Sequence, residues 1–196
     1  MMSNIFYIFL IILLFCSIIN TCNKSVEPGQ DRNIAALTFN FYVHIFFGVI
    51  MKDRFINFAL DEAKIAFNLN EVPVGAVIVR NGEVIAKAHN LKRSTNNIMN
   101  HAEIVAIMEA SGYIGDWRLN DCEMYITLEP CPMCAGAISQ SRIKKIHIGC
   151  ESNIKSNKEL IKKILQNKDA DSFVDIEYLN NKDCSQILTD FFSSKR

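Results

Sequence analysis

The chain has 196 residues, and its 21 basic and 21 acidic side chains leave a formal net charge of zero. Hydrophobic residues make up 49% of the sequence, which excludes a disordered chain. This length suits one domain of ordinary size and leaves no room for a second large one. Zero net charge also excludes a protein that coats nucleic acid nonspecifically, so any contact with nucleic acid must be local.

The first 50 residues differ in composition from the rest of the chain, because they hold only four charged side chains, Lys24, Glu27, Asp31 and Arg32. The apolar run 5–19 could be the core of a signal peptide or a short membrane anchor, and a second apolar stretch covers 34–50. No Lys or Arg precedes the first run, and no small-x-small cleavage site follows it. We therefore expect residues 1–50 to be an apolar extension outside the native protein, which would begin at Met51. The alternative is a membrane-tethered or exported protein.

Helical and strand patterns alternate from Met51 onward, which predicts one globular domain over 51–196. Asn81-Gly82 separates two strand patterns and is typical of a tight antiparallel hairpin. Gly112 is expected to end a helix, and Pro132 to begin one. The expected elements, in chain order, are a helix over 53–68, strands over 74–79 and 84–88, a helix over 102–111, a strand over 124–128, a helix over 132–139, a strand over 146–148, a helix over 158–166, a strand over 174–178, and a last helix that buries Cys184, Ile187, Leu188, Phe191 and Phe192.

The order of these elements predicts the fold class. Helices separate the strands in the second half of the domain, and strand–helix–strand units form right-handed crossovers with parallel pairing. The hairpin adds an antiparallel pair, so the sheet is mixed. We therefore expect an α/β fold in which a five-stranded mixed sheet lies between helices, as in a three-layer α/β/α sandwich.

His101, Cys131 and Cys134 are the candidate ligands of a metal ion. The two cysteines lie three residues apart at the first turn of a predicted helix, so both sulfur atoms face one side near the positive end of the helix dipole, which favours thiolates. One imidazole and two thiolates are the three protein ligands expected of a catalytic zinc, which keeps its fourth position for water. Pro132 fixes the backbone beside Cys131, as a preset metal geometry requires.

Glu103 follows His101 by two residues, which is about 200° around an ideal helix. The two side chains can therefore share a site only if His101 lies at the frayed first turn. A carboxylate beside such a metal could accept a proton from its water and pass it on, since zinc brings the pKa of that water to about 7. The alternative is an acidic residue that only complements the helix dipole.

Each part of this candidate site has another interpretation when it is taken alone. A Cys-x-x-Cys segment can be a redox pair, but a redox pair opens the helix after the first strand of a thioredoxin-like unit, whereas this one follows the third strand. A single histidine is more often a core or surface residue than a ligand, and neither His89 nor His147 has the spacing of a fourth ligand. Free thiols beside a thiolate site suit a reducing cytosol. The cysteines interpreted as apolar fillers or unplaced thiols are Cys16, Cys22, Cys122, Cys150 and Cys184.

Several segments of the domain occur together in one known family. They are Glu71-Val72-Pro73-Val74-Gly75-Ala76-Val77, Asn90, His101-Ala102-Glu103-Ile104, the run 127–138 around Pro130-Cys131-Pro132-Met133-Cys134, Ser141-Arg142-Ile143, and Leu188-Thr189-Asp190-Phe191-Phe192. His-x-Glu followed by Pro-Cys-x-x-Cys is the signature of zinc nucleobase deaminases. Over about residues 53–193, the chain resembles the bacterial tRNA-specific adenosine deaminases.

This resemblance implies a cytidine-deaminase-like α/β/α sandwich and a cytoplasmic homodimer without a membrane partner. It implies a reaction in which the wobble adenosine of a tRNA anticodon stem-loop becomes inosine. His101, Cys131 and Cys134 would then hold one zinc ion per chain, and Glu103 would be the catalytic proton shuttle. Asn90 would bind the flipped nucleotide, and the backbone of Ala102 would help to orient its base.

The chain departs from the family pattern after the fourth strand. There the usual Ala-Arg-Asp-Ala-Lys-Thr-Gly-Ala is replaced by the segment Cys150-Glu151-Ser152-Asn153-Ile154-Lys155-Ser156-Asn157. This loop borders the RNA in the family, and Glu151 and Ser152 replace its Arg and Asp. Replacement phosphate contacts could come from Lys155, Lys158, Lys162 and Lys163, and the alternative is a solvated helix face.

Two other function classes stay open. Guanine and cytosine deaminases that act on free bases share the metal motif, although Val72-Pro73-Val74-Gly75 and the ending 188–192 favour the tRNA enzymes. A noncatalytic zinc-binding or interaction module is the second alternative, and the presence of Glu103 speaks against it.

Overall fold

The computed structural model describes residues 31–152, 155–167 and 173–195. The chain divides into two compact units, Met1–Ile50 and Met51–Arg196. Helix α2 (Asp31–Asn68) contains the predicted helix 53–68 and begins earlier than expected. The apolar run 5–19 lies outside the described residues. Within the described part of the chain, no helix is long and apolar enough to cross a membrane.

The second unit is built on a five-stranded sheet with the strand order β2-β1-β3-β4-β5. Its strands are β1 (Gly75–Arg80), β2 (Glu83–His89), β3 (Cys122–Leu128), β4 (Lys145–Cys150) and β5 (Asp175–Tyr178). Strand β1 pairs antiparallel with β2 and β3, whereas β4 pairs parallel with β3 and β5. The predicted mixed sheet is therefore confirmed. Asn81 and Gly82 both have positive φ in the hairpin turn, as expected of this dipeptide.

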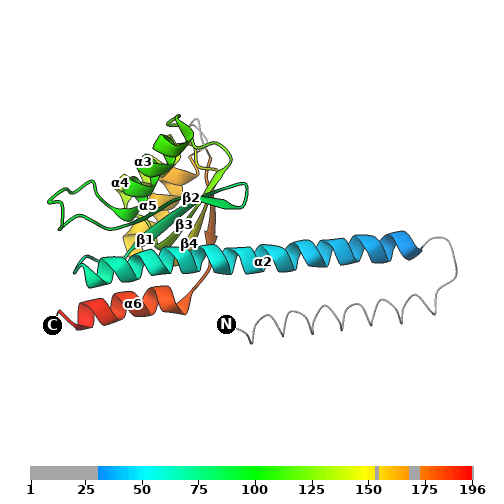
Figure 1. The fold of residues 1–196 in the computed structure, drawn as a ribbon, viewed down its shortest axis with the longest axis horizontal. Helices are drawn as coiled ribbons and strands as arrows, with labels where there is room; N and C mark the ends of the chain where they lie inside the picture. The colour runs from blue at the N-terminus through cyan, green and yellow to red at the C-terminus, as the bar shows by residue number, and fades with distance from the viewer. Residues whose placement is uncertain (1–30, 153–154, 168–172, 196) are drawn as a thin grey trace. The chain divides into compact units, whose positions relative to one another are not determined.

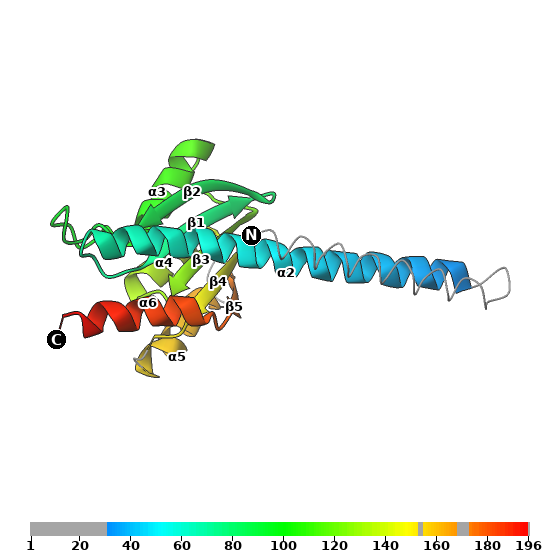
Figure 2. The ribbon, with the colours of Figure 1, turned by 60° about the horizontal axis from the view of Figure 1, so that its bottom comes forward.

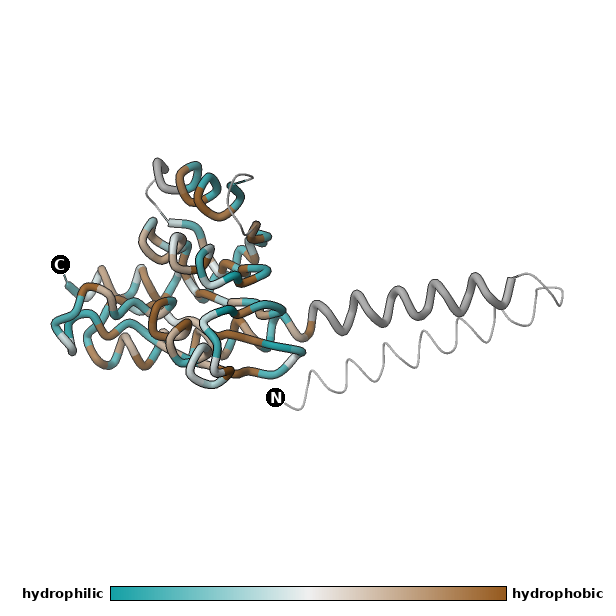
Figure 3. The backbone as a smooth tube through the Cα atoms, turned by 90° about the horizontal axis from the view of Figure 1, so that it is seen from above, coloured by the Kyte–Doolittle hydropathy of each residue, from teal (hydrophilic) through white to brown (hydrophobic). Residues whose placement is uncertain are grey.

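Helices cover both faces of the sheet (Figures 1 and 2). One hydrophobic cluster joins the sheet to α3 (Ala102–Ile114), α4 (Pro132–Gln140) and α5 (Lys155–Leu165). The other cluster joins the opposite face to α6 (Lys182–Ser193) and to the part of α2 that begins at Met51. Figure 3 shows polar and apolar residues alternating along these covering helices, as expected when one side of a helix packs on a sheet. The three-layer sandwich predicted from the sequence is confirmed.

Two glycines of the sheet let the covering helices pack close to it. A Cβ atom added at Gly75 of β1 would lie 1.9 Å from the Ala59 carbonyl oxygen of α2. One added at Gly149 of β4 would lie 2.6 Å from the Cys184 sulfur of α6. Only a residue without a side chain fits at these contacts.

Two predictions of detail were wrong. Helix α3 continues through Gly112 to Ile114, and Gly115, with a φ of 78°, is its left-handed C-cap. Phe192, expected to be buried, is 52% exposed. Phe191 takes the buried position beside Phe67, and consecutive residues of a helix point about 100° apart. The other predicted elements of the second unit lie within three residues of the observed bounds.

Candidate metal and catalytic site

The three predicted ligands lie at the beginnings of two helices. His101 is the N-cap of α3 and has an extended backbone, with φ −78° and ψ 152°. Cys131 is the N-cap of α4, also with an extended backbone, and Pro132 follows it in the first turn together with Cys134. Because β3 ends at Leu128 just before α4, the sheet places the helix start, and the loop after β2 brings His101 to it.

The distances between the donor atoms fit a tetrahedral zinc site. His101 Nδ1 lies 3.8 Å from Cys131 Sγ and 3.6 Å from Cys134 Sγ. Zinc–sulfur bonds of about 2.3 Å and zinc–nitrogen bonds of about 2.0 Å at tetrahedral angles require about 3.5 Å between nitrogen and sulfur. All three ligand atoms lie within 4.8 Å of one another. The donor set and its spacing are therefore those of a zinc site with three protein ligands.

The two cysteines of this group differ in acidity. A hydrogen bond from the Cys134 thiol, opposed by burial but supported by backbone N–H groups and His101, lowers the pKa of Cys131 to about 5. The pKa of Cys134 is raised, because its proton is held in that hydrogen bond and its sulfur is buried beside Glu103 and Cys131. Without a metal, the expected thiolate therefore forms at Cys131 alone, since two adjacent thiolates repel each other. A bound cation favours the loss of the second proton.

Glu103 lies beside this group, in the first turn of α3, and is only 3% exposed. Glu103 and His101 can share a site only if the backbone of His101 is not helical. The structure has an extended backbone at His101. Burial raises the pKa of the Glu103 carboxyl, and the negative charge of Cys131 adds to this effect, while hydrogen bonds and His101 oppose it. A carboxyl group with a raised pKa is suited to accepting and releasing protons near neutral pH.

A cavity of about 300 Å³ opens beside these residues. Its lining residues are Glu71, Val72, Val74, Asn90, Lys92, Arg93, His101, Glu103, Leu128, Glu129 and Cys131. This volume is at the lower end of the range for small-molecule sites, and the lining combines apolar side chains with polar and charged ones. Two of the candidate ligands, His101 and Cys131, and the candidate proton shuttle Glu103 therefore face a space in which a substrate can bind.

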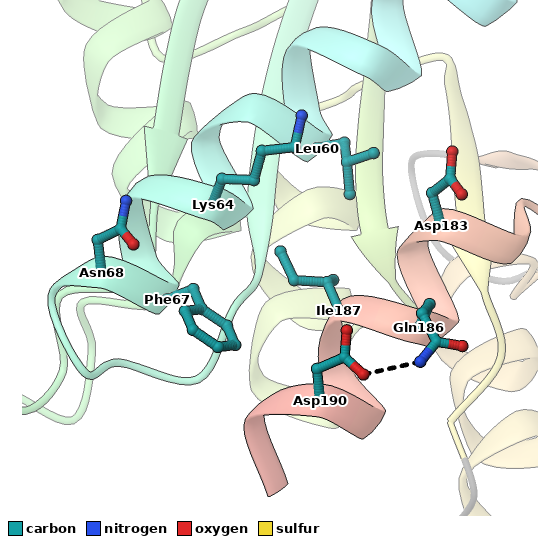
Figure 4. A pocket seen from close by; sticks show the side chains of 8 residues that line it. All are labelled: Leu60, Lys64, Phe67, Asn68, Asp183, Gln186, Ile187 and Asp190. Carbon is teal, nitrogen blue, oxygen red and sulfur yellow. Dashed lines mark hydrogen bonds between the residues drawn. The ribbon is translucent and has the colours of Figure 1, made fainter. Parts of the chain in front are cut away.

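A second, larger cavity lies on the other face of the sheet, between α2 and α6, and has a volume of about 420 Å³. Figure 4 shows the side chains that line it, among them Phe67 and Ile187. In this lining, Gln186 donates a hydrogen bond of 2.7 Å to Asp190. It contains none of the predicted site residues. We place the candidate site in the smaller cavity, because His101, Cys131 and the buried Glu103 line that one.

The chain was then compared with known proteins. The family model of the MafB19-like deaminases matches residues 50–196. A tRNA-specific adenosine deaminase of Bacillus subtilis (strain 168) is 52% identical over 91 residues, which cover 46% of this chain and 56% of that protein. A tRNA-specific adenosine deaminase of Aquifex aeolicus (strain VF5) is 39% identical over 145 residues, which cover 74% of this chain and 96% of that protein. The chain belongs to the tRNA-specific adenosine deaminase family.

A solved structure agrees with this assignment. A chain from biochemical and structural studies of A-to-I editing by tRNA:A34 deaminases at the wobble position of transfer RNA has a TM-score of 0.64 and 34% identity. The match covers 69% of this chain and 99% of the solved one. The deaminase fold predicted from the sequence is therefore confirmed for this member of the family.

Asn90 and Ala102 are joined by a hydrogen bond in this family member. The Ala102 backbone N–H donates to Asn90 Oδ1 at 2.9 Å, and Asn90 Nδ2 donates to the Val72 carbonyl at 2.9 Å. Asn90 thus links the loop before β1 to the start of α3 and lines the cavity. The Ala102 N–H is already used within the protein, and one N–H of the Asn90 amide is left for a ligand.

Two other histidines do not join the ligand group. His89 Nδ1 lies 2.8 Å from Glu62, and His147 Nε2 lies 2.8 Å from Glu123. Both are therefore engaged elsewhere in the fold. Their spacing from the cysteine pair already indicated this.

Sequence reasoning assigned no role to four charged residues that line the cavity, Glu71, Lys92, Arg93 and Glu129. Glu71 and Glu129 are nearly buried, at 1% and 5% exposure. Tyr178 of β5 donates a hydrogen bond of 2.7 Å to Glu129. The one available signal was that Glu71 and Glu129 belong to the segments shared with the family.

The altered loop after β4 lies next to this cavity. The Ser152 backbone N–H donates to Glu129 Oε2 at 3.4 Å, and Lys158 of α5 forms an ion pair of 2.5 Å with Glu151. Residues 153–154 lie outside the described residues. Glu151 therefore pairs within the protein with one of the lysines that were candidates for phosphate contacts.

Proposed function

We propose that this protein is a zinc-dependent hydrolase that converts the wobble adenosine of a tRNA anticodon to inosine and releases ammonia. The observation that carries the proposal is one cavity lined by His101, Cys131 and the buried Glu103, with Cys134 completing the metal-ligand group. The curated relatives are named tRNA-specific adenosine deaminases. The match to the Aquifex aeolicus protein covers 96% of that protein and 74% of this chain.

One zinc ion per chain would be held by His101, Cys131 and Cys134. A zinc ion with three such ligands makes water acidic enough to be a nucleophile near neutral pH. The N-cap positions of His101 and Cys131 leave their side chains outside the helical backbone, where their donor atoms can converge.

Glu103 would move the protons of the reaction. Water adds its oxygen to C6 of the adenine ring, the carbon–nitrogen bond to the amine breaks, and ammonia leaves. The ring nitrogen N1 must gain a proton when oxygen adds, and the amine must gain one when it departs. A carboxylate can accept one proton from the attacking water and deliver it to N1, and then accept the proton of the added hydroxyl group and deliver it to the departing amine. The burial of Glu103 beside the metal-ligand group suits this role.

The cavity would receive the adenine after it leaves the base stack of the anticodon loop, as enzymes that act on nucleobases require. The free N–H of the Asn90 amide would donate to the flipped nucleotide. The Ala102 backbone would act through the hydrogen bond that holds Asn90 in this orientation. A tRNA substrate places the protein in the cytoplasm and requires no membrane partner.

A homodimer is part of this proposal. Large apolar side chains are exposed at α3 and directly after it, with Met108 at 65%, Tyr113 at 72% and Trp117 at 52%. Exposed apolar groups of this size mark interaction surfaces. A second copy of the chain is the occupant that the family resemblance favours, and sedimentation of the full chain would measure the stoichiometry.

A substrate panel tests the function. The purified full chain, loaded with zinc, is incubated with an anticodon stem-loop that carries adenosine at the wobble position, and separately with free guanine, cytosine and adenosine. We expect inosine in the stem-loop and far slower release of ammonia from the free compounds. Guanine or cytosine as the preferred substrate would favour the free-base deaminases, and no turnover at all would favour the noncatalytic module.

A further inference from the structure

Two adjacent cations, Lys92 and Arg93, lie on the loop between β2 and α3 and line the cavity. Both side chains are exposed. Within the described ranges, Lys92 forms no ion pair, and the hydrogen bond of Arg93 goes to the uncharged Asn70 carbonyl at 3.3 Å. Other lysines of the domain, such as Lys64 and Lys145, lie within 2.8 Å of a carboxylate. The positive charges at the cavity are therefore not compensated by ion pairs.

The loop that carries these cations is held by a buried carboxylate. Glu71 Oε1 accepts hydrogen bonds from the Ser94 backbone N–H at 2.6 Å and from Ser94 Oγ at 2.8 Å. Asn90, at the other end of the same short segment, is bonded to Val72 and Ala102. These contacts fix the backbone on both sides of Lys92 and Arg93, so less loop entropy is lost when a ligand binds there.

The carboxylates that line the cavity already accept hydrogen bonds from the protein. Glu71 accepts from Ser94, and Glu129 accepts from the Tyr178 hydroxyl at 2.7 Å. Glu103 is buried at the metal-ligand group. The cations thus lie on the exposed part of the lining, whereas the three acids are nearly buried. An anionic group attached to a base in the cavity would be attracted to this exposed part.

We propose that Lys92 and Arg93 bind the phosphates that flank the base in the cavity, so the site selects a base within a phosphodiester strand over a free base. This inference rests on the proposed function and specifies its substrate class. A free nucleobase carries no phosphate and gains nothing from these cations. In an RNA loop, the flipped nucleotide carries a phosphate on each side, so cations at the cavity edge can attract both.

The test compares Lys92→Ala/Arg93→Ala with wild type in the zinc-loaded full chain. For an anticodon stem-loop we expect KM to rise about 10- to 100-fold, more than any fall in kcat, because the contacts are to phosphate and not to the reacting atoms. The slope of log(kcat/KM) against log salt should become shallower by about 1.4, since each single-strand phosphate contact contributes about 0.7. The charge-preserving Lys92→Arg/Arg93→Lys should retain most of the affinity.

A matched control removes the same charge elsewhere. Arg54→Ala/Lys182→Ala removes an exposed arginine of α2 and an exposed lysine of α6, neither of which lines the cavity, and its KM should stay within about twofold of wild type. An unchanged KM and salt slope in the Lys92/Arg93 variant would overturn the inference, and so would an equal effect of the Arg54/Lys182 variant.

Binding without turnover separates this inference from the proposed function. Fluorescence anisotropy with the same labelled stem-loop measures affinity whether or not inosine forms. If wild type binds the RNA through these cations but makes no inosine, the proposed function fails and the phosphate contacts stand. If wild type makes inosine and the variant binds equally well, the phosphate contacts fail and the function stands.

Discussion

His101 and Cys131 share one backbone feature that explains why their side chains meet. Both are N-cap residues with extended φ and ψ, and each lies directly before the first turn of a helix. A side chain at this position projects along the helix start, and α3 and α4 begin on the same side of the sheet. Cys134 lies one helical turn after Cys131, so its sulfur atom lies beside the Cys131 sulfur and His101 Nδ1.

The first prediction concerns a ligand. Cys131→Ala should reduce bound zinc from about one ion per chain to well below half, because a site with three protein ligands cannot lose one and keep its affinity. Metal analysis after dialysis measures this. The control is Cys122→Ala, a buried cysteine of β3 outside the group, which should retain the metal. Undiminished zinc in Cys131→Ala would refute the assignment.

The second prediction concerns Glu103. Glu103→Gln keeps the size and most hydrogen bonds of the side chain but cannot carry a proton, so single-turnover inosine formation should fall by about 10²- to 10⁴-fold. Zinc content and RNA affinity should stay close to wild type. Glu109→Gln, an exposed residue on the same helix, is the matched control and should be fully active. A rate for Glu103→Gln equal to that of wild type would exclude the proton shuttle.

At the scale of elements, close packing of α2 on β1 depends on Gly75. The backbone of Ala59 occupies the space that any side chain at this position would need. Helix and strand backbones can approach this closely only where the Cβ atom is missing. Gly112, in contrast, lies within α3 and has no atom within 4 Å of an added Cβ.

The third prediction follows from this difference. Gly75→Ala should lower the free energy of unfolding by roughly 3 kcal/mol, because either the helix or the strand must shift. Gly112→Ala should raise it by about 0.5–1 kcal/mol, since alanine is the better helix former. Urea unfolding followed by circular dichroism measures both changes. Equal effects of the two variants would show that α2 does not pack on β1 as described.

At the scale of the whole second unit, a network of charges ties three strands and one helix together on the face of the sheet opposite α3. Glu177 of β5 lies 2.6 Å from Lys52 of α2 and 2.7 Å from Lys145 of β4. His147 of β4, only 1% exposed, lies between Glu123 and Glu177 at 2.8 and 3.3 Å. The network connects β3, β4, the edge strand β5 and the covering helix α2.

The fourth prediction is a pH dependence of stability. Burial opposes ionisation of Glu177, but hydrogen bonds from Lys145 and Lys52 outweigh it and lower its pKa to about 2. An unfolded Glu has a pKa of about 4.3, so the stabilisation is complete above that pH and is lost as the pH falls toward 2. Glu177→Gln should lower the free energy of unfolding by about 1 kcal/mol at pH 7, a value reduced for solvent screening.

Unfolding curves between pH 7 and pH 2 check this prediction. The difference between wild type and Glu177→Gln should shrink as the pH falls, because a protonated glutamic acid and a glutamine are both neutral. The control is Glu83→Gln, which removes an exposed carboxylate beside the hairpin turn and should show no such trend. A difference independent of pH would mean that the packing of the side chain matters, and not its charge.

The sequence by itself determined the features that depend on near neighbours. Helix starts, the Asn81-Gly82 turn and the strand patterns need only residues within a few positions, and local backbone preferences act over that range. The ligand group was predictable for the same reason, since two of its members share one helical turn. The order of strands and helices then limited the fold to an α/β sandwich.

Only the tertiary structure decided which side chains complete the site. Tyr178 meets Glu129 across 49 positions of the chain, and Ser94 meets Glu71 across 23. Such pairs depend on how strands lie beside one another, because a side chain reaches its partner only after the sheet has formed. The burial of Phe191 in place of Phe192 was settled in the same way, by the rotation of α6 against the sheet, which local sequence preferences leave undetermined.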